Sequence, residues 1–472
     1  MSPNDHVPLD ELADQAGRVR VAVIGGGIAG LVAALECTKV GLQVTVFETS
    51  ERLGGTVSTV ELDGIRVDTG ADCFASRGRL ARLVDELGLA GALIAPATET
   101  RWVVGTGGGD DAAPLPEDTL LGIPENMFGH EAQAILGTGG TWRAYLDRLR
   151  PPLTIGHERR LSVLVRTRMG QKVLDRLVAP LAVGVYGAVP DDIDVDAAAP
   201  GLNAALTRTG SLSGAVATLR AQRGGSAIRS VEGGMSRLVD ALEAQLRAAG
   251  AEIRVATSVS ALEPAGDRWT VRAVDEDLEA DAVIVATPEA SARALLNPIV
   301  PTLDTAPSGG IPVETVTLVV DAPGLDAHPR GAEALALPGS RAAAAALHLT
   351  AKWGIGDGRH VVRIAFGGPD TAPATAGLDD AAATEMAATE AAALFGVAIE
   401  RVRAAHRARF TLAPSHAVTG RRRLATQARN AIEAVPRLAA TGAWLSGSGL
   451  AQVTDDAAAT ADRLRRRALF SD

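Results

Sequence analysis

Short runs of almost wholly apolar residues predict the central strands of this chain. Three such runs occupy residues 21–24, 44–47 and 281–287. Strands that are apolar at nearly every position are typical of a parallel sheet covered on both faces. A glycine-rich turn follows the first run, and a helix opens near Ile28. The order strand, helix, strand therefore predicts an α/β fold with a parallel sheet.

Other periodic segments fill in the rest of the chain. Helical spacing of apolar residues predicts helices around Leu80–Leu87 and over residues 161–177. Further helices are predicted over 235–249 and 455–469, and an alanine-rich helix over 379–395. Alternation predicts an antiparallel sheet from strands at 315–320, 343–349 and 361–366. Further strands are predicted at 253–259 and 269–274, with a final strand and turn at 442–450.

These segments predict a nucleotide-binding domain that is interrupted twice. We assign it residues 19–105, 225–300 and 410–472, where the apolar strands occur. A helical, substrate-binding insertion is predicted at 106–224, and a mixed-sheet, substrate-binding insertion at 301–409. A chain of 472 residues is too long for one hydrophobic core, so more than one domain is expected.

The segment 161–177 carries Arg166, Arg168, Lys172 and Arg176. One interpretation is a solvated helix face. The other is a surface that meets acidic substrate groups or anionic lipid, which would allow weak peripheral contact with a membrane.

Composition excludes several classes of protein. The net charge of −10 argues against an extended nucleic-acid surface. Cys37 and Cys73 are the only cysteines, too few for a disulfide framework or a zinc site. We find no apolar run of about 18 residues, so no membrane-spanning helix is expected. Residues 1–18 lack a cationic, apolar signal core and are interpreted as a mobile leader, which favours a cytoplasmic protein.

The glycine turn has the form of a dinucleotide fingerprint. Gly25 permits the tight turn, Gly27 lets the backbone approach a pyrophosphate, and Gly30 lets helix and strand pack closely. Glu48 ends the second strand 18 residues after Gly30, where a carboxylate can accept hydrogen bonds from a ribose. A tight turn without a ligand is the alternative, but the flanking strands, helix and acid favour a dinucleotide site.

The segment Arg52-Leu-Gly-Gly55 follows the acid closely. This arrangement resembles the FAD-binding two-dinucleotide superfamily, and the resemblance selects FAD over NAD as the cofactor.

Several collinear segments resemble the oxygen-dependent protoporphyrinogen and coproporphyrinogen oxidases. Besides the fingerprint they are residues 68–74, 115–124, 181–187, 231–235, 347–367 and 447–450. The segments at 115–124, 181–187 and 352–354 discriminate most, because the nucleotide motifs are shared with amine oxidases and carotenoid desaturases. The family has a soluble branch, the coproporphyrinogen III oxidases of actinobacteria and other Gram-positive bacteria, and a membrane-bound branch. Without a membrane segment and with an acidic net charge, this chain resembles the soluble branch more.

The resemblance implies a set of FAD contacts. It places Gly25, Gly26, Gly27, Ile28, Ala29 and Gly30 at the pyrophosphate and Glu48 at the adenosine ribose. It places Arg52, Gly55 and Thr56 along the pyrophosphate and flavin, and Val259 at the adenine. It places Gly70, Ala71, Asp72, Cys73, Gly449, Leu450 and Val453 beside the isoalloxazine.

The same resemblance implies the substrate site. Arg101 matches an arginine near a substrate carboxylate, and a guanidinium suits a propionate. Gly184 matches a glycine whose carbonyl faces the tetrapyrrole, and Tyr186 follows it in the same motif. A surface arginine and a helix break are the structural alternatives for Arg101 and Gly184. No catalytic side chain and no metal ligand are assigned.

The implied activity is oxidation of coproporphyrinogen III to coproporphyrin III with release of peroxide, within haem biosynthesis. Three alternatives remain: protoporphyrinogen IX oxidation, an amine oxidase or desaturase, and a non-catalytic FAD-binding paralogue. Residues 412–421 depart from the family pattern, which leaves the substrate preference open. Handover of the product to a ferrochelatase is also left open.

Overall fold

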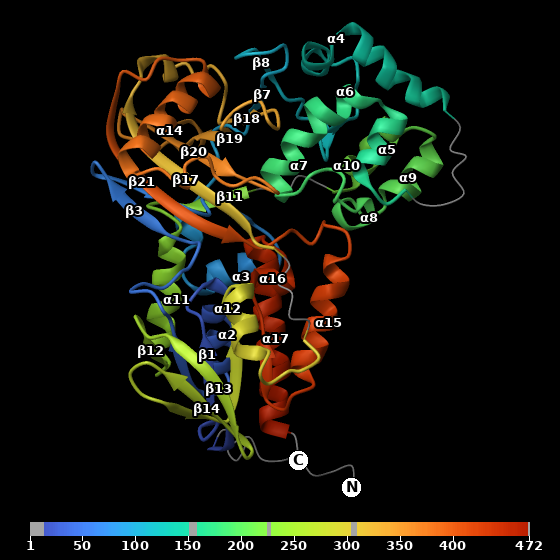
Figure 1. Ribbon diagram of the computed structural model, residues 1–472. Helices are drawn as coiled ribbons and strands as arrows, with labels where there is room; N and C mark the ends of the chain where they lie inside the picture. Colours follow the sequence, from blue (N-terminus) through green and yellow to red (C-terminus); the bar gives the residue numbers. More distant parts are fainter. Residues whose placement is uncertain (1–13, 151–157, 224–227, 304–308, 471–472) are drawn as a thin grey trace.

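A five-stranded parallel sheet forms the base of the molecule in Figure 1. The computed structural model describes residues 14–150, 158–223, 228–303 and 309–470, so most of the predicted leader lies outside the described residues. The strand order is β12-β2-β1-β16-β22, and every neighbouring pair is parallel. The strands are β1 Arg20–Ile24, β2 Gln43–Phe47, β12 Glu252–Arg254, β16 Ala282–Val285 and β22 Leu438–Ala440.

Both faces of this sheet are buried, which explains why its strands are continuously apolar. In β1, Val21 and Val23 face one core, whereas Ala22 and Ile24 face the other. Four helices cover the first face: α2 Ile28–Thr38, α3 Gly78–Glu86, α11 Ser236–Ala248 and α17 Leu450–Phe470. The second face is covered by α12 Glu289–Leu296, α15 Arg421–Glu433, α16 Ala443–Ser446 and the small sheet of β13 Val259–Ala265, β14 Arg268–Ala273 and β15 Leu278–Ala280.

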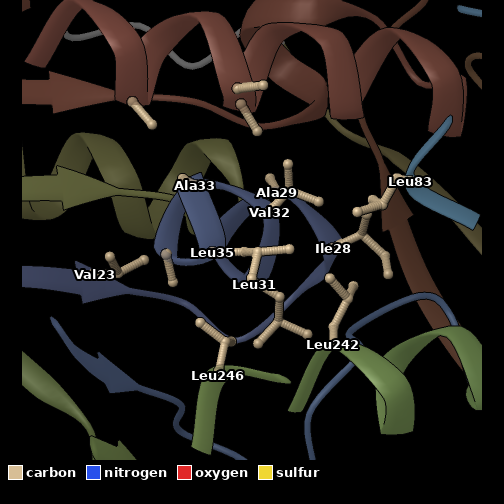
Figure 2. Close-up of a cluster of buried hydrophobic side chains, with 14 of the residues drawn as sticks. Val23, Ile28, Ala29, Leu31, Val32, Ala33, Leu35, Leu83, Leu242 and Leu246 are labelled. Atoms are coloured by element: carbon tan, nitrogen blue, oxygen red, sulfur yellow. The ribbon is translucent and has the colours of Figure 1, made fainter. Parts of the chain in front are cut away.

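Helix α2 lies at the centre of the first core. All of its residues from Ile28 to Cys37 are buried, which is typical of a helix enclosed on every side. Figure 2 shows its side chains among Val23 of β1, Leu83 of α3 and Leu242 and Leu246 of α11. Because α2 begins at the glycine turn, this packing fixes the position of the turn.

A second sheet of seven strands lies above the first in Figure 1. Its order is β21-β17-β20-β19-β18-β7-β8, and helix α14 Asp380–Phe395 packs on it. The strands are β7 Arg101–Val104, β8 Ala112–Pro114, β17 Ile311–Asp321, β18 Glu333–Ala336, β19 Ala343–His348, β20 His360–Gly367 and β21 Arg401–Leu412. The antiparallel pairing of β17, β20 and β19 confirms the predicted strands at 315–320, 343–349 and 361–366.

A helical region covers part of the seven-stranded sheet. Its core includes Val103, Leu335 and Ala345 from that sheet. The region contains α4 His130–Tyr145, α5 Leu161–Arg168, α6 Gln171–Val173, a π-helical turn at Leu174–Val178, α7 Ala179–Tyr186, α8 Val195–Ala198, α9 Leu202–Thr209, α10 Leu212–Arg223 and the short pair β9 Thr119–Leu120 and β10 Ile123–Pro124.

Short elements connect the two sheets. The hairpin of β3 Thr59–Leu62 and β4 Ile65–Asp68 packs Ile65 and Val67 against Val319, Leu349 and Val361. A three-stranded sheet joins β5 Phe74–Ala75, β11 Ile228–Val231 and β6 Leu93–Ile94, and helix α13 Leu349–Trp353 lies between β19 and β20 in the chain. These contacts hold the upper sheet over the glycine turn.

The prediction of one helix over residues 161–177 is wrong. Gly170 has φ +100° and separates α5 from α6. The cations are not simply a solvated face either, because the buried Arg168 pairs with Asp147. Arg176 donates a hydrogen bond to the Ile135 carbonyl. Amphipathic spacing could not reveal these partners, since they come from other segments.

Two predicted strands also need correction. The strand at 253–259 ends at Arg254, because the amides of Ala256 and Thr257 donate to the carbonyls of Ser50 and Glu48 and turn the chain away. The final strand is Leu438–Ala440, and residues 443–446 form α16 instead. The last helix begins at Leu450, five residues before the predicted start at 455.

The predicted domain boundaries at 105 and 409 fall inside or beside strands of the upper sheet. Strand β7 pairs with β18, so residues 101–104 belong to that sheet and not to the parallel one. Strand β21 continues to Leu412. The three-part division of the chain itself stays a prediction.

Candidate cofactor and substrate site

The glycine turn has the close packing that its sequence predicts. Gly25 has φ +110°, and its amide donates to the Phe47 carbonyl at 2.8 Å. A Cβ on Gly30 would lie 1.9 Å from the Gly25 carbonyl oxygen, so no side chain fits there. Helix α2 can therefore approach the sheet only with glycine at this position.

By contrast, the mouth of the turn is open. A Cβ on Gly27 would meet no atom within 4 Å, and one on Gly55 would meet only the Gly27 Cα, at 3.5 Å. Gly27 is the N-cap of α2 without a side-chain cap, and no acidic residue lies in the first turn. The free amide groups and the positive end of the helix dipole fit a diphosphate.

Glu48 supports the turn through its carboxylate. Oε2 accepts a hydrogen bond from the Gly26 amide at 2.7 Å, and Oε1 accepts from the amide and hydroxyl of Ser50, each at 2.8 Å. Because a carboxylate offers about four acceptor positions, one remains for a ribose hydroxyl. Val259 begins β13 close to this point, since the Thr257 amide donates to the Glu48 carbonyl.

Residues 69–73, which we call the flavin loop because the sequence predicts flavin contacts at 70–73, lie against the segment after Glu48. The amides of Thr69 and Ala71 donate to the carbonyls of Ser58 and Thr56, at 2.9 and 3.1 Å. A Cβ on Gly70 would lie 2.1 Å from the Thr56 oxygen. Ala71 also packs on the core that contains Ile28, Leu450 and Val453. The fold thus brings together the predicted contacts around the turn, Thr56, the loop and the start of α17.

The exposed Arg52 lies just beyond Glu48, and no side-chain hydrogen bond or ion pair involves it within the described residues. Burial lowers the pKa of His406 on β21, and the positive charge of Arg52 lowers it further. Arg52 is therefore available to an anion in the mouth of the turn.

The carboxylate of Asp72 is bound by two side chains of α13. Its buried Oδ2 accepts hydrogen bonds from Lys352 Nζ and Trp353 Nε1, both at 2.9 Å. Burial opposes its ionisation, but Lys352 and Arg363 together hold its pKa below the usual range. Its side chain is thus committed to the protein, and its backbone is what remains for a flavin.

Cys73 links the flavin loop to the predicted substrate residues. Burial raises the pKa of its thiol to about 11, so the thiol is protonated and unreactive at neutral pH. The charges of Asp72 and Glu333 contribute to this raised pKa. Glu333 is the partner of Arg101, with Nε to Oε2 at 2.7 Å.

Arg101, Gly184 and Tyr186 lie around β7 and β18. Arg101 begins β7, and its side chain is 44% exposed. Glu333 raises the pKa of Arg101 further, so the guanidinium stays charged. Gly184 lies on α7, where a Cβ would be 3.3 Å from Leu335 of β18. Leu335 pairs with Val103 of β7, and Tyr186 packs at the edge of the helical core.

Three residues at this site were not predicted: Lys352, Trp353 and Arg363. Arg363 of β20 donates to the carbonyls of Asp68 and Gly70. The sequence marks 352–354 as a motif, but it does not reveal that Lys352 and Trp353 bind the carboxylate of Asp72. Lys352 and Asp72 are 280 positions apart in the chain, and only the fold brings them together.

Comparison with known proteins agrees with this geometry. Residues 28–464 match the family described as flavin containing amine oxidoreductase. The chain belongs to this family. It is therefore an FAD-dependent oxidoreductase, which confirms the predicted cofactor and enzyme class.

The curated relatives include coproporphyrinogen III oxidases. The chain is 30% identical to that of Mycobacterium tuberculosis over 442 residues, covering 91% of this chain and 93% of the relative. It is 31% identical to that of Propionibacterium freudenreichii over 345 residues, covering 66% and 64%. The predicted resemblance to porphyrinogen oxidases is thereby confirmed.

Solved structures share the fold. An Exiguobacterium protein, classed as a protoporphyrinogen oxidase by inference, superposes with a TM-score of 0.82 at 23% identity, covering 95% of this chain and 98% of that one. Putrescine oxidase bound to putrescine superposes with a TM-score of 0.67 at 17% identity, covering 95% and 99%.

Within the described ranges, none of the helices combines the length and the apolar character that a membrane span requires.

Proposed function

We propose that this chain oxidises coproporphyrinogen III to coproporphyrin III within porphyrin biosynthesis, with oxygen as acceptor and hydrogen peroxide as product. The observation that carries the proposal is the 30% identity to a coproporphyrinogen III oxidase over 93% of that relative's length. Such an alignment includes the helical region and the upper sheet as well as the nucleotide fold. A likeness limited to the fingerprint would not distinguish substrates.

The glycine turn and the flavin loop would hold the cofactor. Amides at the start of α2 would bind the diphosphate, with Arg52 as a second source of positive charge. When bound there, FAD would supply two-electron oxidation chemistry at the reduced meso carbons, with oxygen as the final electron acceptor, and three such oxidations convert a porphyrinogen to a porphyrin. The protein's own part is to orient the macrocycle and to exclude water.

Arg101 would orient the substrate through a propionate. Its side chain is partly exposed, and it already pairs with Glu333. A guanidinium can bind two carboxylates at different edges, so a propionate would either join Glu333 or replace it. Protons from the pyrrole nitrogens would pass to solvent, and we assign no side chain as the base. Transfer of the product to a ferrochelatase remains part of this proposal.

The test is a substrate panel with the FAD-loaded protein. Peroxide and oxygen consumption are measured with coproporphyrinogen III, protoporphyrinogen IX and simple amines, and the same protein stripped of FAD is the control. We expect the highest kcat/KM with coproporphyrinogen III and no peroxide from the stripped protein.

Other outcomes would contradict the proposal in distinct ways. A preference for protoporphyrinogen IX would reassign the substrate. Turnover of amines alone would favour an amine oxidase. No turnover by a yellow, FAD-loaded protein would favour a non-catalytic paralogue.

A further inference from the structure

The flavin loop is held by the upper sheet through three successive backbone carbonyls. Arg363 of β20 donates to the carbonyls of Asp68 and Gly70, and Thr315 of β17 donates to the Thr69 carbonyl at 3.1 Å. The amides of Thr69 and Ala71 point to the opposite side, toward residues 56–58. The loop is therefore fixed by its own backbone between the upper sheet and residues 56–58.

Helix α13 adds a charged anchor to this arrangement. Lys352 and Trp353 both donate to the same carboxylate oxygen of Asp72, and Lys352 Nζ also lies 5.0 Å from the centre of the Trp353 ring. The side chains of Lys352 and Asp72 are only 12% and 11% exposed. An ion pair this buried holds its geometry, because separating the charges would leave the Lys352 ammonium buried without its partner. Arg363 Nη1, 3.6 Å from Oδ1, is the second cation at Asp72.

The backbone of Lys352 reaches the substrate side of the site. Its carbonyl accepts a hydrogen bond from the Ala97 amide at 2.8 Å. Ala97 lies four residues before Arg101, the first residue of β7 and the predicted partner of a propionate. One residue therefore contacts both the flavin loop and the segment that leads into the substrate strand.

We propose that Lys352, with Trp353 and Asp72, is a positioning device that fixes the flavin loop relative to the substrate strand and places a positive charge beside the bound flavin. The inference rests on the proposed placement of FAD against residues 70–73. Positive charge stabilises a reduced, more negative flavin. Lys352 offsets the negative charge of Asp72 in the flavin loop, so its presence raises the reduction potential as well as setting the geometry.

The test compares variants of the FAD-loaded protein by the midpoint potential of the flavin, the dissociation constant of FAD and the unfolding transition. Lys352→Met removes the charge but keeps an apolar stem, and Lys352→Arg restores the charge. Trp353→Phe removes one donor to Asp72. Trp353 lines a cavity of about 190 Å³ together with Asp72 and Arg363, where water can replace the lost donor.

Arg341→Met is the matched control. Arg341, in the turn between β18 and β19, forms a similarly buried ion pair with Glu390 of α14, with Nε to Oε2 at 2.8 Å. It contacts neither the flavin loop nor α13 in any hydrogen bond or ion pair within the described ranges. Loss of this pair lowers stability without touching the proposed device.

We expect Lys352→Met to lower the midpoint potential and to raise the dissociation constant of FAD about tenfold, which corresponds to about 1.4 kcal/mol. Lys352→Arg should restore both values, and Arg341→Met should change only the unfolding transition. Trp353→Phe should change the midpoint potential and the dissociation constant in the same directions as Lys352→Met, but by less. If Lys352→Met does not fold, Trp353→Phe still tests the proposal.

A purely structural role would give the opposite result. If Lys352→Met and Trp353→Phe lower stability but leave the potential and FAD affinity at wild-type values, the proposal is overturned. None of these measurements uses a porphyrinogen. A wild-type protein that binds FAD without oxidising porphyrinogens would contradict the proposed function. The comparison of the variants by flavin potential and FAD affinity would still be valid.

Discussion

Gly27 and Gly30 lie in one turn, yet the structure gives them separate purposes. A Cβ on Gly30 would collide with the Gly25 carbonyl, whereas a Cβ on Gly27 would point into open space. We expect Gly30→Ala to lower the free energy of unfolding by about 1–3 kcal/mol through overpacking. Gly27→Ala should change the stability of the FAD-free protein by less than about 1 kcal/mol, the usual range for an N-cap change.

The two variants differ in how they lose the cofactor. Gly27→Ala should fold normally and bind FAD weakly, because its methyl group occupies the position where the diphosphate approaches. Urea unfolding of the FAD-free proteins and titration with FAD, followed by flavin fluorescence, provide both measurements. Wild-type FAD affinity in Gly27→Ala would contradict the placement of the diphosphate at this turn.

Single residues show how far the sequence could lead. The packing of Gly25 and Gly30 was predictable, because the glycine spacing carries its own steric reason. The hydrogen-bond partners of the Asp72 carboxylate were not predictable, since Lys352 and Trp353 come from a segment 280 positions away. The role of Arg101 at a propionate stays a prediction, and no local pattern could reveal its pairing with Glu333.

At the scale of elements, Gly170 decides where the helical region bends. It has φ +100°, and a Cβ there would lie 2.9 Å from Cγ of Arg143. Arg143 in turn donates to the carbonyls of Arg168 and Thr167 at the end of α5. We expect Gly170→Ala to lower the free energy of unfolding by about 1–3 kcal/mol, through backbone strain and the displaced arginine.

Gly139→Ala is the control on the helix that carries Arg143. A Cβ there would meet no atom within 4 Å, so the unfolding free energy should rise by about 0.4–1 kcal/mol. Thermal or urea unfolding of both variants makes the comparison. Equal stability of Gly170→Ala and wild type would show that the break between α5 and α6 is not imposed by this glycine.

Elements were predicted best where their periodicity is strong and their neighbours are close in sequence. The strands of the antiparallel sheet follow their alternation, whereas helix α14 follows its content of alanine, a strong helix former. The segment 161–177 also has a helical period, but periodicity does not register one glycine in a left-handed conformation. Likewise, the strand at 253–259 is apolar enough to continue, and only backbone contacts with Ser50 and Glu48 end it.

At the scale of the whole molecule, the site depends on two sheets being held in register. Ile65 and Val67 of the β3–β4 hairpin pack on Val319, Leu349 and Val361 of the upper sheet. Strand β7, from the first quarter of the chain, extends that sheet beside β18. The sequence could indicate an interrupted nucleotide domain, but not which distant strands pair across the insertions.

The central claim is that two sheets held in this register let a bound flavin oxidise a porphyrinogen directly. The most direct test is rapid anaerobic mixing of the FAD-loaded protein with coproporphyrinogen III, followed by flavin absorbance. We predict loss of the oxidised flavin band in a single turnover, and its return with peroxide when oxygen is admitted. A flavin that stays oxidised with excess coproporphyrinogen III, yet is reduced by dithionite, would contradict the account.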